Sequence, residues 1–120
     1  MTSDEVLNPE TVAELRRAQQ RYDNPTLIRQ LAELFRENAP ARMAQLREAV
    51  AGRDALTLER VAHTLRGNCG LLGAMKMADA CARLEEAGGR LAFDDAERVV
   101  EEAEREFSRV LEAVEKLEEA

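Results

Sequence analysis

The sequence is poor in the residues that mark sheets, tight turns and aromatic binding surfaces. Aromatic residues make up only 3% of the chain, tryptophan is absent, and the 120 residues include three prolines and six glycines. Alanine, leucine, glutamate and arginine dominate instead, and all four favour helix. A chain of this length is long enough for one domain with one core. The composition therefore predicts an all-α fold.

An excess of basic charge and long apolar runs are also lacking. The chain has 17 Lys and Arg against 24 Asp and Glu, a formal net charge of −7, and its pI is about 4.8. Nucleic-acid binders more often carry a basic stripe, so neither DNA nor RNA is an expected partner. No run of about 18 apolar residues occurs, so no membrane-spanning helix is expected. The polar start, MTSDEVLNPE, does not resemble a signal peptide, so we expect a cytoplasmic protein that does not bind membranes.

Cysteine and histidine are too sparse for a familiar metal site. Cys69 and Cys81 are the only cysteines, and neither lies in a CxxC motif or in a cluster with histidine. We therefore expect no zinc or other metal. Free cysteines are most often buried and behave as small apolar side chains. Two buried thiols, and no cofactor of the chain's own, are the expectation.

Apolar periodicity predicts one short helix followed by four longer ones. The short helix begins at Asn8 and Pro9, and the longer helices cover about residues 25–51, 55–70, 74–87 and from Asp94 or Asp95 to about 117. The connections are short, which favours antiparallel neighbours. The expected architecture is an antiparallel up-down four-helix bundle with a short additional N-terminal helix. Residues 1–120 are expected to form a single domain.

Local signals define the expected helix starts. Asn24 followed by Pro25 is typical of an N-cap with proline at the first helical position, and Asp54 can cap the following helix. Pro40 lacks a backbone donor and clashes with the preceding turn. It is therefore expected either to kink the helix over residues 25–51 or to divide it into two helices nearly end to end.

Glycines define the expected helix ends. AGGR, at residues 87 to 90, is expected to end the fourth helix, and a turn is expected between Gly70 and Gly73. The apolar face expected for residues 25–51 consists of Leu27, Leu31, Leu34, Phe35, Met43, Leu46 and Val50.

The only histidine lies in a stretch that is rich in glycine for a helix. Residues 62 to 73 read AHTLRGNCGLLG and contain His63, Gly67, Gly70 and Gly73. At about 100° per residue, Gly67 and Gly70 fall within about 40° of His63, and Arg66 within about 60°. The apolar residues of this helix lie on the opposite side: Leu58, Val61, Leu65, Cys69 and Leu72. His63 is therefore expected to face away from the core, while Gly73 is expected to serve the turn.

An exposed imidazole beside glycines suits the transfer of a phosphoryl group. A neutral imidazole is nucleophilic, and an unperturbed one is mostly neutral at pH 7. Glycine allows a bulky group to approach closely, and the guanidinium of Arg66 offers a fixed charge and donors suited to phosphate. The chain has no P-loop, no nucleotide-binding glycine loop and no metal cluster. We therefore expect His63 to carry phosphate with the help of a partner's catalytic groups.

The stretch HTLRGNCGLLG resembles the signature of histidine-containing phosphotransfer (HPt) domains of two-component phosphorelays. The signature combines a histidine, a basic residue, a glycine and small or apolar residues, and it is matched by His63, Leu65, Arg66, Gly67, Cys69, Leu72 and Gly73. The resemblance extends over about residues 25–117. It implies a four-helix bundle with the phosphorylated histidine exposed midway along one helix.

The resemblance also implies roles for individual residues. His63 would accept phosphate on Nε2 and exchange it with an aspartate of a response-regulator receiver domain, whose Mg²⁺ would assist the transfer. Arg66 would offset phosphate charge in a position where the family often has lysine. Gly67 and Gly70 would clear space for the ring and the docking partner. Glu85, on the next helix, would hydrogen-bond Nδ1 and orient the ring.

A receiver domain, a hybrid histidine kinase, or both, are the implied partners. The expected docking residues near His63 are Gly67, Gly70, Asn68, Arg60 and Lys76. Asn68 stands where the family usually has a smaller residue, so it either narrows the surface or offers a hydrogen bond. A monomer is expected, because one bundle can bury its own apolar stripes.

Two other functions stay open at this point. A helical adaptor that binds a receiver or kinase without carrying phosphate would share the fold, and replacing His63 would distinguish it. A bundle with His63 as an axial cofactor ligand would need ligands that point inward from several helices, and its absorbance spectrum would reveal it. The pathway, the donor kinase and the direction of phosphate flow are not specified. The initial methionine favours a free-standing protein over a fragment of a hybrid kinase.

Overall fold

The computed structural model describes residues 6–119, and this part of the chain is entirely helical, with no strand. The helices are α1 (Pro9–Arg21), α2 (Leu27–Ala51), α3 (Ala55–Leu72), α4 (Met75–Gly89) and α5 (Phe93–Glu119). The all-α prediction is therefore confirmed. The first five residues of the polar start, and Ala120 of the predicted domain, lie outside the described residues.

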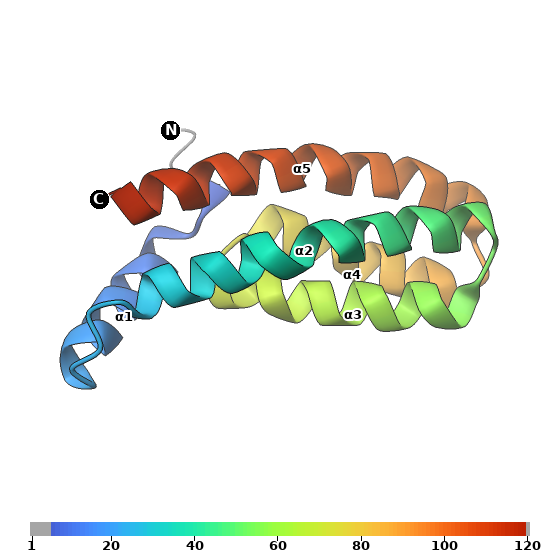
Figure 1. Ribbon diagram of the computed structural model, residues 1–120. Helices are drawn as coiled ribbons and strands as arrows, with labels where there is room; N and C mark the ends of the chain where they lie inside the picture. Colours follow the sequence, from blue (N-terminus) through green and yellow to red (C-terminus); the bar gives the residue numbers. More distant parts are fainter. Residues whose placement is uncertain (1–5, 120) are drawn as a thin grey trace.

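Helices α2 to α5 lie along one another (Figure 1). The chain runs from left to right in α2, back in α3, forward again in α4 and back in α5. Both α3 and α5 pack between α2 and α4, so α3 and α5 occupy opposite corners of the bundle. Each long helix therefore turns one face to the core and leaves another in solvent.

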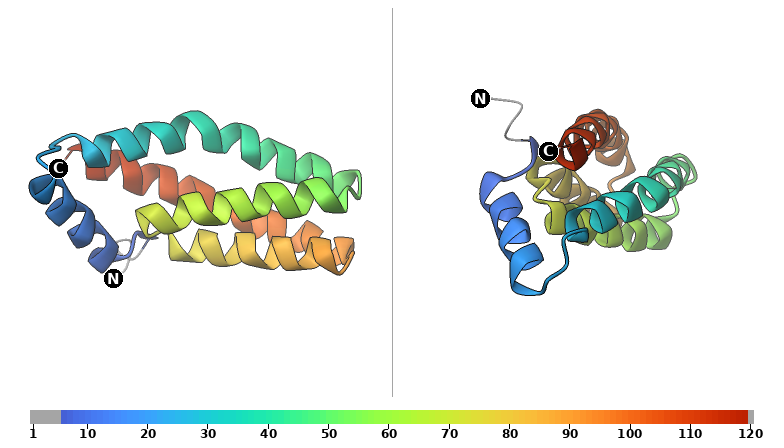
Figure 2. Two further views of the ribbon diagram at one scale, coloured as in Figure 1. Left: turned by 90° about the horizontal axis from the view of Figure 1, so that it is seen from below. Right: turned by 60° about the vertical axis from the view of Figure 1, so that its left-hand side comes forward.

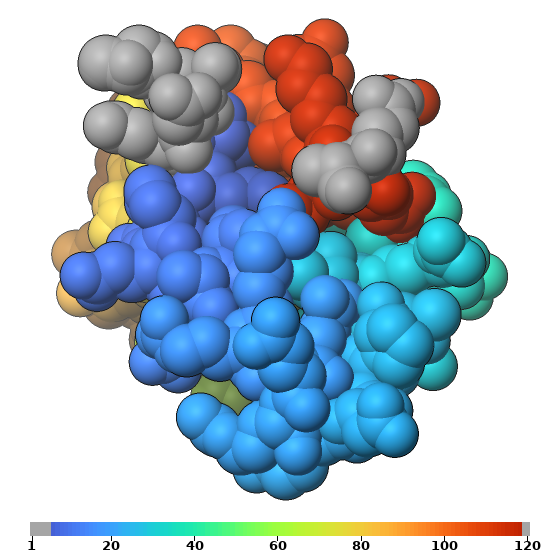
Figure 3. Space-filling view, turned by 90° about the vertical axis from the view of Figure 1, so that its left-hand side faces the viewer, coloured from blue at the N-terminus to red at the C-terminus, as the bar shows by residue number. Residues whose placement is uncertain are grey.

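The short helix α1 crosses one end of the long helices at an angle (Figure 2). It contacts α2 and α3, and Figure 3 shows it covering that end, beside the start of α2 and the end of α5. A backbone hydrogen bond of 2.8 Å from Asn8 N to the carbonyl oxygen of Gly73 ties the start of α1 to the turn after α3. The short N-terminal helix thus covers the end of the bundle where α3 passes into α4.

The core consists of aliphatic side chains with small residues between them. The largest fully buried side chains are Leu46, Leu58, Leu65, Leu72, Met77, Leu84, Val100, Val110, Val114, Cys69 and Cys81. One aromatic pair contributes, with the rings of Phe35 and Phe107 5.9 Å apart between α2 and α5. The apolar side of α3 that was predicted to lie opposite His63 is buried or half-buried as expected.

Helices α3 and α4 approach each other closely, because α4 presents small residues to α3. Its buried face includes Ala78, Cys81 and Gly88. A Cβ atom at Gly88 would lie 3.0 Å from Cγ of Glu59 and 3.3 Å from the carbonyl oxygen of Ala55. Gly88 therefore permits the close approach of the two helices.

The predicted helix starts are partly confirmed. Asn8 caps α1, its Oδ1 accepting hydrogen bonds from two backbone amides, and Asp54 Oδ1 accepts one from Thr57 N at 3.2 Å at the start of α3. The N-cap of α2 was expected at Asn24, which is wrong: Thr26 occupies it, and its side chain makes no capping hydrogen bond. A free amide of the first turn donates instead to Gln19 of α1, so a tertiary contact replaces the local cap.

Two other boundaries differ from the prediction. The last helix was expected to begin at Asp94 or Asp95, one of which would cap it, but α5 already begins at Phe93 and both aspartates lie in its first turn. Acidic side chains are also favourable there, because the helix N-terminus carries partial positive charge. Pro40 lies inside α2, which continues as one helix from Leu27 to Ala51. The alternative of two separate helices is therefore wrong.

The helix ends show which glycines serve turns. Gly73 adopts the left-handed conformation, with φ of 77°, directly after α3. The prediction that AGGR ends α4 is confirmed, because α4 ends at Gly89 and Arg90 is its C-cap, and the left-handed residue that follows is Leu91, with φ of 57°. Asp23 after α1 and Arg53 after α2 adopt the same left-handed conformation. Such ends are stabilised by backbone hydrogen bonds that reach back over the last turn.

The predicted core face of α2 is wrong at one position. The side chains that α2 buries are Ile28, Ala32, Phe35, Ala39, Met43, Leu46, Ala49 and Val50. Leu34 was expected among them but is 55% exposed, because Phe35, about 100° further round the helix, takes the inward position. Leu34 consequently lies on the surface beside α3.

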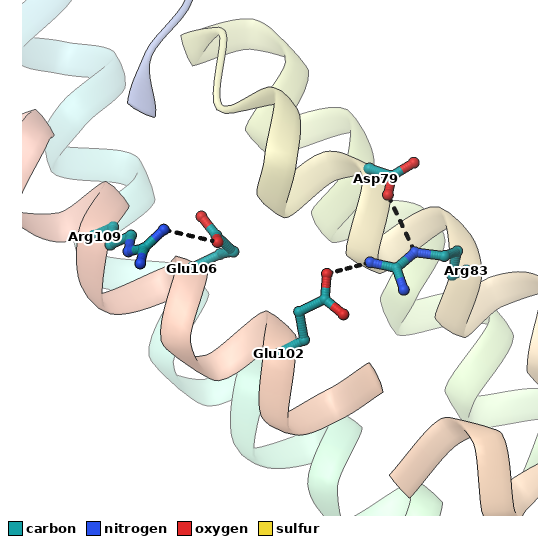
Figure 4. A network of polar contacts seen from close by, with 5 residues as sticks. All are labelled: Asp79, Arg83, Glu102, Glu106 and Arg109. Carbon is teal, nitrogen blue, oxygen red and sulfur yellow. Dashed lines mark hydrogen bonds and ion pairs between the residues drawn. The ribbon is translucent and has the colours of Figure 1, made fainter. Parts of the chain in front are cut away.

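Ion pairs join the outer faces of the long helices. In Figure 4, Arg83 of α4 bridges Asp79 on its own helix and Glu102 on α5. The hydrogen bond from Arg83 lowers the pKa of Glu102. Arg47 of α2 makes two hydrogen bonds, of 2.7 and 2.6 Å, to Glu104 of α5. Surface pairs of this kind contribute about 0.2–1 kcal/mol each, so they support a packing that the core determines.

Candidate functional site

Helix α3 holds His63 on its solvent face. The neighbouring residues Ala62 and Leu65 are fully buried, so the helix is anchored to the core on the opposite side. The side chain of His63 is 65% exposed. The prediction that the helix turns this histidine outward is therefore confirmed.

Two charged side chains meet the ring at Nδ1. Oε2 of Glu85, from α4, lies 3.1 Å from Nδ1, and Nη2 of Arg66, one turn further along α3, lies 3.3 Å from it. Arg66 Nη2 is also 3.5 Å from Oε1 of Glu85. The structure thus brings together the three residues that the sequence singled out, and within residues 6–119 no hydrogen bond engages Nε2.

The contact with Glu85 has a chemical consequence for the ring. A carboxylate only accepts hydrogen bonds, so this contact favours a proton on Nδ1. The lone pair of a neutral ring then lies on Nε2, the nitrogen that neither Glu85 nor Arg66 contacts. This arrangement is suited to nucleophilic attack by Nε2 on an incoming group.

The glycines beside His63 have no packing role within the described structure. A Cβ atom added at Gly67 or Gly70 would meet no other atom within 4 Å, and both residues are exposed. Glycine in a helix interior costs about 1 kcal/mol relative to alanine. Since no internal contact accounts for this cost, the space beside the ring is available to an external partner.

A groove between α2 and α3 lies next to this glycine face. It has a volume of about 190 Å³ and is lined by Leu31, Leu34, Phe35, Asn38, Arg42, Asn68, Leu71 and Leu72. Leu34 and Leu71 are exposed at 55% and 59%, so two large aliphatic side chains of this groove are in contact with solvent. Of the residues predicted to dock a partner, only Asn68 lines this groove.

The sequence interpretation missed the groove residues of α2. Leu34 was assigned to the core, and no pattern within one helix indicates that it lies opposite Leu71 of α3. The available signal was Leu71 itself, which falls only about 80° from His63 on the helical wheel and so lies off the apolar stripe. Arg60 and Lys76, two other predicted docking residues, are exposed. Neither makes a polar contact with His63 within the described part of the chain.

The two cysteines lie buried between α3 and α4, as expected, and both are free thiols. The contact with Cys81, together with burial, raises the pKa of the Cys69 thiol. A protonated and buried thiol is a poor nucleophile, so Cys69 does not compete with His63. In residues 6–119 no group of three or more His, Cys, Asp or Glu side chains is arranged to hold a metal ion, and no helix is long and apolar enough to cross a membrane.

Comparisons with known proteins agree with this geometry. A family model described as the Hpt domain matches residues 30–120. Among solved structures, the chain is similar to the crystal structure of histidine-containing phosphotransfer protein B from Pseudomonas aeruginosa PAO1, with 26% sequence identity, a TM-score of 0.83 and 92% of each chain covered. No curated protein matches the chain significantly. The matched region includes the whole arrangement around His63, and the chain therefore belongs to the Hpt domain family, as a phosphotransfer protein of two-component phosphorelays.

Proposed function

We propose that His63 accepts a phosphoryl group on Nε2 and exchanges it with an aspartate of a receiver domain, on a response regulator or a hybrid histidine kinase. The observation that carries this proposal is the exposed imidazole whose Nδ1 lies 3.1 Å from the Glu85 carboxylate, while no hydrogen bond within residues 6–119 engages Nε2. This is the only histidine in the chain, so no other imidazole competes for the role.

The transfer balances without any further reactant. The lone pair of Nε2 forms a bond to phosphorus as the bond between phosphorus and the aspartyl oxygen breaks, and the aspartate leaves as a carboxylate. The proton on Nδ1 stays between the ring and Glu85, which stabilises the positive charge that develops on the ring. The reverse step returns the phosphoryl group to a receiver aspartate, so the chain can relay in both directions.

The chain would contribute positioning and charge rather than catalysis of its own. Phosphoryl transfer depends mostly on alignment and on the neutralisation of equatorial oxygen charge. Arg66, close to the ring, would offset part of that charge. The Mg²⁺ that assists the reaction would be bound by the receiver, and we expect no cofactor and no kinase activity in the chain itself.

The receiver would dock over the glycine face and the adjoining groove. Gly67 and Gly70 leave open space beside His63. Asn68 follows Gly67 on α3 and lines the adjoining groove, in which Leu34 and Leu71 are exposed. Exposed apolar residues beside a reactive group are typical of a surface that a partner covers.

Basic residues at the edge of this surface would meet the acidic active site of a receiver. Arg60 and Lys76 are both exposed, on α3 and α4, in a chain whose net charge is −7. We expect them to assist docking through electrostatic attraction, in a monomeric protein of the cytoplasm.

The proposal is tested by transfer from a phosphorylated receiver. The protein is incubated with a receiver and a kinase in the presence of radioactive ATP, and then separated from both. We expect an acid-labile, alkali-stable phosphate on the wild type and none on His63→Gln. Circular dichroism of the variant controls for folding, and labelling that persists in a folded His63→Gln variant would overturn the proposal.

A further inference from the structure

The two contacts at Nδ1 of His63 are chemically incompatible as simultaneous hydrogen bonds. Glu85 carries a carboxylate, which only accepts, and Arg66 carries a guanidinium, which only donates. Nδ1 of a neutral ring bears either a proton or a lone pair. Because both side chains lie within 3.3 Å of this atom, each one supports a different protonation of the ring.

The two arrangements differ in reactivity. With the proton on Nδ1, Glu85 accepts it and the lone pair lies on Nε2, toward solvent. With the proton on Nε2, Arg66 donates to the lone pair on Nδ1, and the outward nitrogen has no lone pair with which to attack phosphorus. Glu85 therefore supports the reactive tautomer, and Arg66, in the position that the structure shows, supports the unreactive one.

We propose that Arg66 opposes the reactive tautomer of His63 in the resting protein, and that Glu85 is the positioning residue that outweighs it. Arg66 assists transfer only after its guanidinium leaves Nδ1 for the phosphoryl oxygens. This inference rests on the proposed function for its biological meaning, but the tautomer of the ring can be measured without any transfer.

The balance between the two residues follows from the strengths of their contacts. Each contact has one ionised partner, so both belong to the stronger, charge-assisted class of hydrogen bond, and the contact of 3.1 Å to Glu85 is the shorter of the two. The ring is well exposed, so we take the low end of the range of free energies measured for hydrogen bonds to charged groups. That free energy corresponds to about a 10-fold effect on the tautomer ratio.

Arg66 also lies close to the second oxygen of Glu85. This oxygen, Oε1, is shielded from solvent and accepts no hydrogen bond, and it lies 3.5 Å from Nη2 of Arg66. At 3.5 Å this contact is longer than a normal hydrogen bond, so Glu85 restrains the guanidinium only weakly. An incoming phosphoryl group, with more charge and better-placed acceptors, can therefore draw Arg66 away at little cost.

The experiment uses the fact that His63 is the only histidine in the chain. Nitrogen-15 NMR of a protein purified without a histidine tag reports the tautomer ratio of this ring directly. Spectra are recorded at about pH 8.5, where an unperturbed imidazole is neutral. The variants are Glu85→Leu, Arg66→Ala and the double variant.

Matched controls remove the same charges elsewhere. Glu86→Leu removes an exposed carboxylate from the next position of α4, and Arg105→Ala removes an exposed arginine from α5, the helix at the opposite corner from α3. Circular dichroism checks that every variant keeps its helices. A variant that only loosened the helix would not favour one tautomer over the other.

We expect the wild type, Arg66→Ala and both controls to hold the proton mainly on Nδ1. Glu85→Leu should lower the ratio of the Nδ1 to the Nε2 tautomer by about 10-fold, and the double variant should recover part of that loss. An unchanged ratio in Glu85→Leu, or a double variant no different from it, would overturn the inference. Absence of phosphate on His63 in the transfer assay would instead overturn the proposed function and leave the measured tautomer as it is.

Discussion

The two glycines beside His63 offer the most direct test of how this surface is built. A Cβ atom at Gly67 or Gly70 would meet nothing within 4 Å, so alanine should fit either position without strain. Replacing glycine by alanine in a helix interior raises the free energy of unfolding by about 0.5–1 kcal/mol. For a domain of this size, that corresponds to a rise in Tm of about 2–5 °C for each substitution.

The same substitutions should impair phosphotransfer. The added methyl group would project into the space that we assign to the docked receiver, on the face that carries His63. A displacement of about 1 Å between reacting groups can cost up to about 100-fold in rate. We therefore expect Gly67→Ala and Gly70→Ala to melt at higher temperature, yet to accept phosphate from a receiver about 10- to 100-fold more slowly. Thermal unfolding by circular dichroism and single-turnover transfer measure the two effects on the same samples.

Gly88 provides the matched control, because its Cβ position is occupied by α3. The Cβ of an alanine there would lie 3.0 Å from Cγ of Glu59. This steric crowding should offset the gain in helix propensity, so Tm should not rise. A fall in Tm for Gly67→Ala or Gly70→Ala would show that the space beside His63 is not open. A rise in Tm with an unchanged transfer rate would show that docking does not need that space.

Two further predictions concern stability. Gly73→Ala should destabilise the fold by about 2 kcal/mol, because alanine is strained at a φ of 77° and its Cβ would lie 2.8 Å from Cβ of Thr11. Urea unfolding measures this change, and an unchanged unfolding free energy would show that α1 moves aside easily. Arg47→Ala should cost about 0.5–1 kcal/mol at pH 7, through loss of the surface pair with Glu104. The hydrogen bond from Arg47 lowers the pKa of Glu104 in the folded protein. The pair therefore contributes its full stabilisation above the pKa of an unfolded glutamate, about 4.3. The difference in unfolding free energy between wild type and Arg47→Ala should vanish as the pH falls through the lower pKa of the folded state. A difference that persists in urea unfolding at about pH 2 would contradict this linkage.

The helices were predictable because their signals are local. Asn8 and Asp54 were identified as caps from the residues that follow them, and Gly73 as a turn residue from its place after an apolar run. The failures arose where a tertiary contact replaced a local signal. Gln19 of α1 accepts a hydrogen bond from the first turn of α2, where Asn24 was expected to provide the cap.

The site was predictable in part for the same reason. His63, Arg66, Gly67 and Gly70 share one face of one helix, and helical periodicity alone places them together. Glu85 lies 22 residues away on another helix. The sequence connected it to His63 only through resemblance to a family, since no spacing rule links two helices whose relative position is unknown.

The sequence by itself determined the helical content, the outward direction of His63 and the presence of glycines beside it, because each of these depends on the geometry of a single helix. Only the tertiary structure decided which side chains meet Nδ1, that Leu34 and Leu71 line one groove, and that Gly67 and Gly70 face open space while Gly88 does not. These features depend on how α2, α3 and α4 pack, and the packing of three helices is set jointly by all their buried side chains rather than by any one segment.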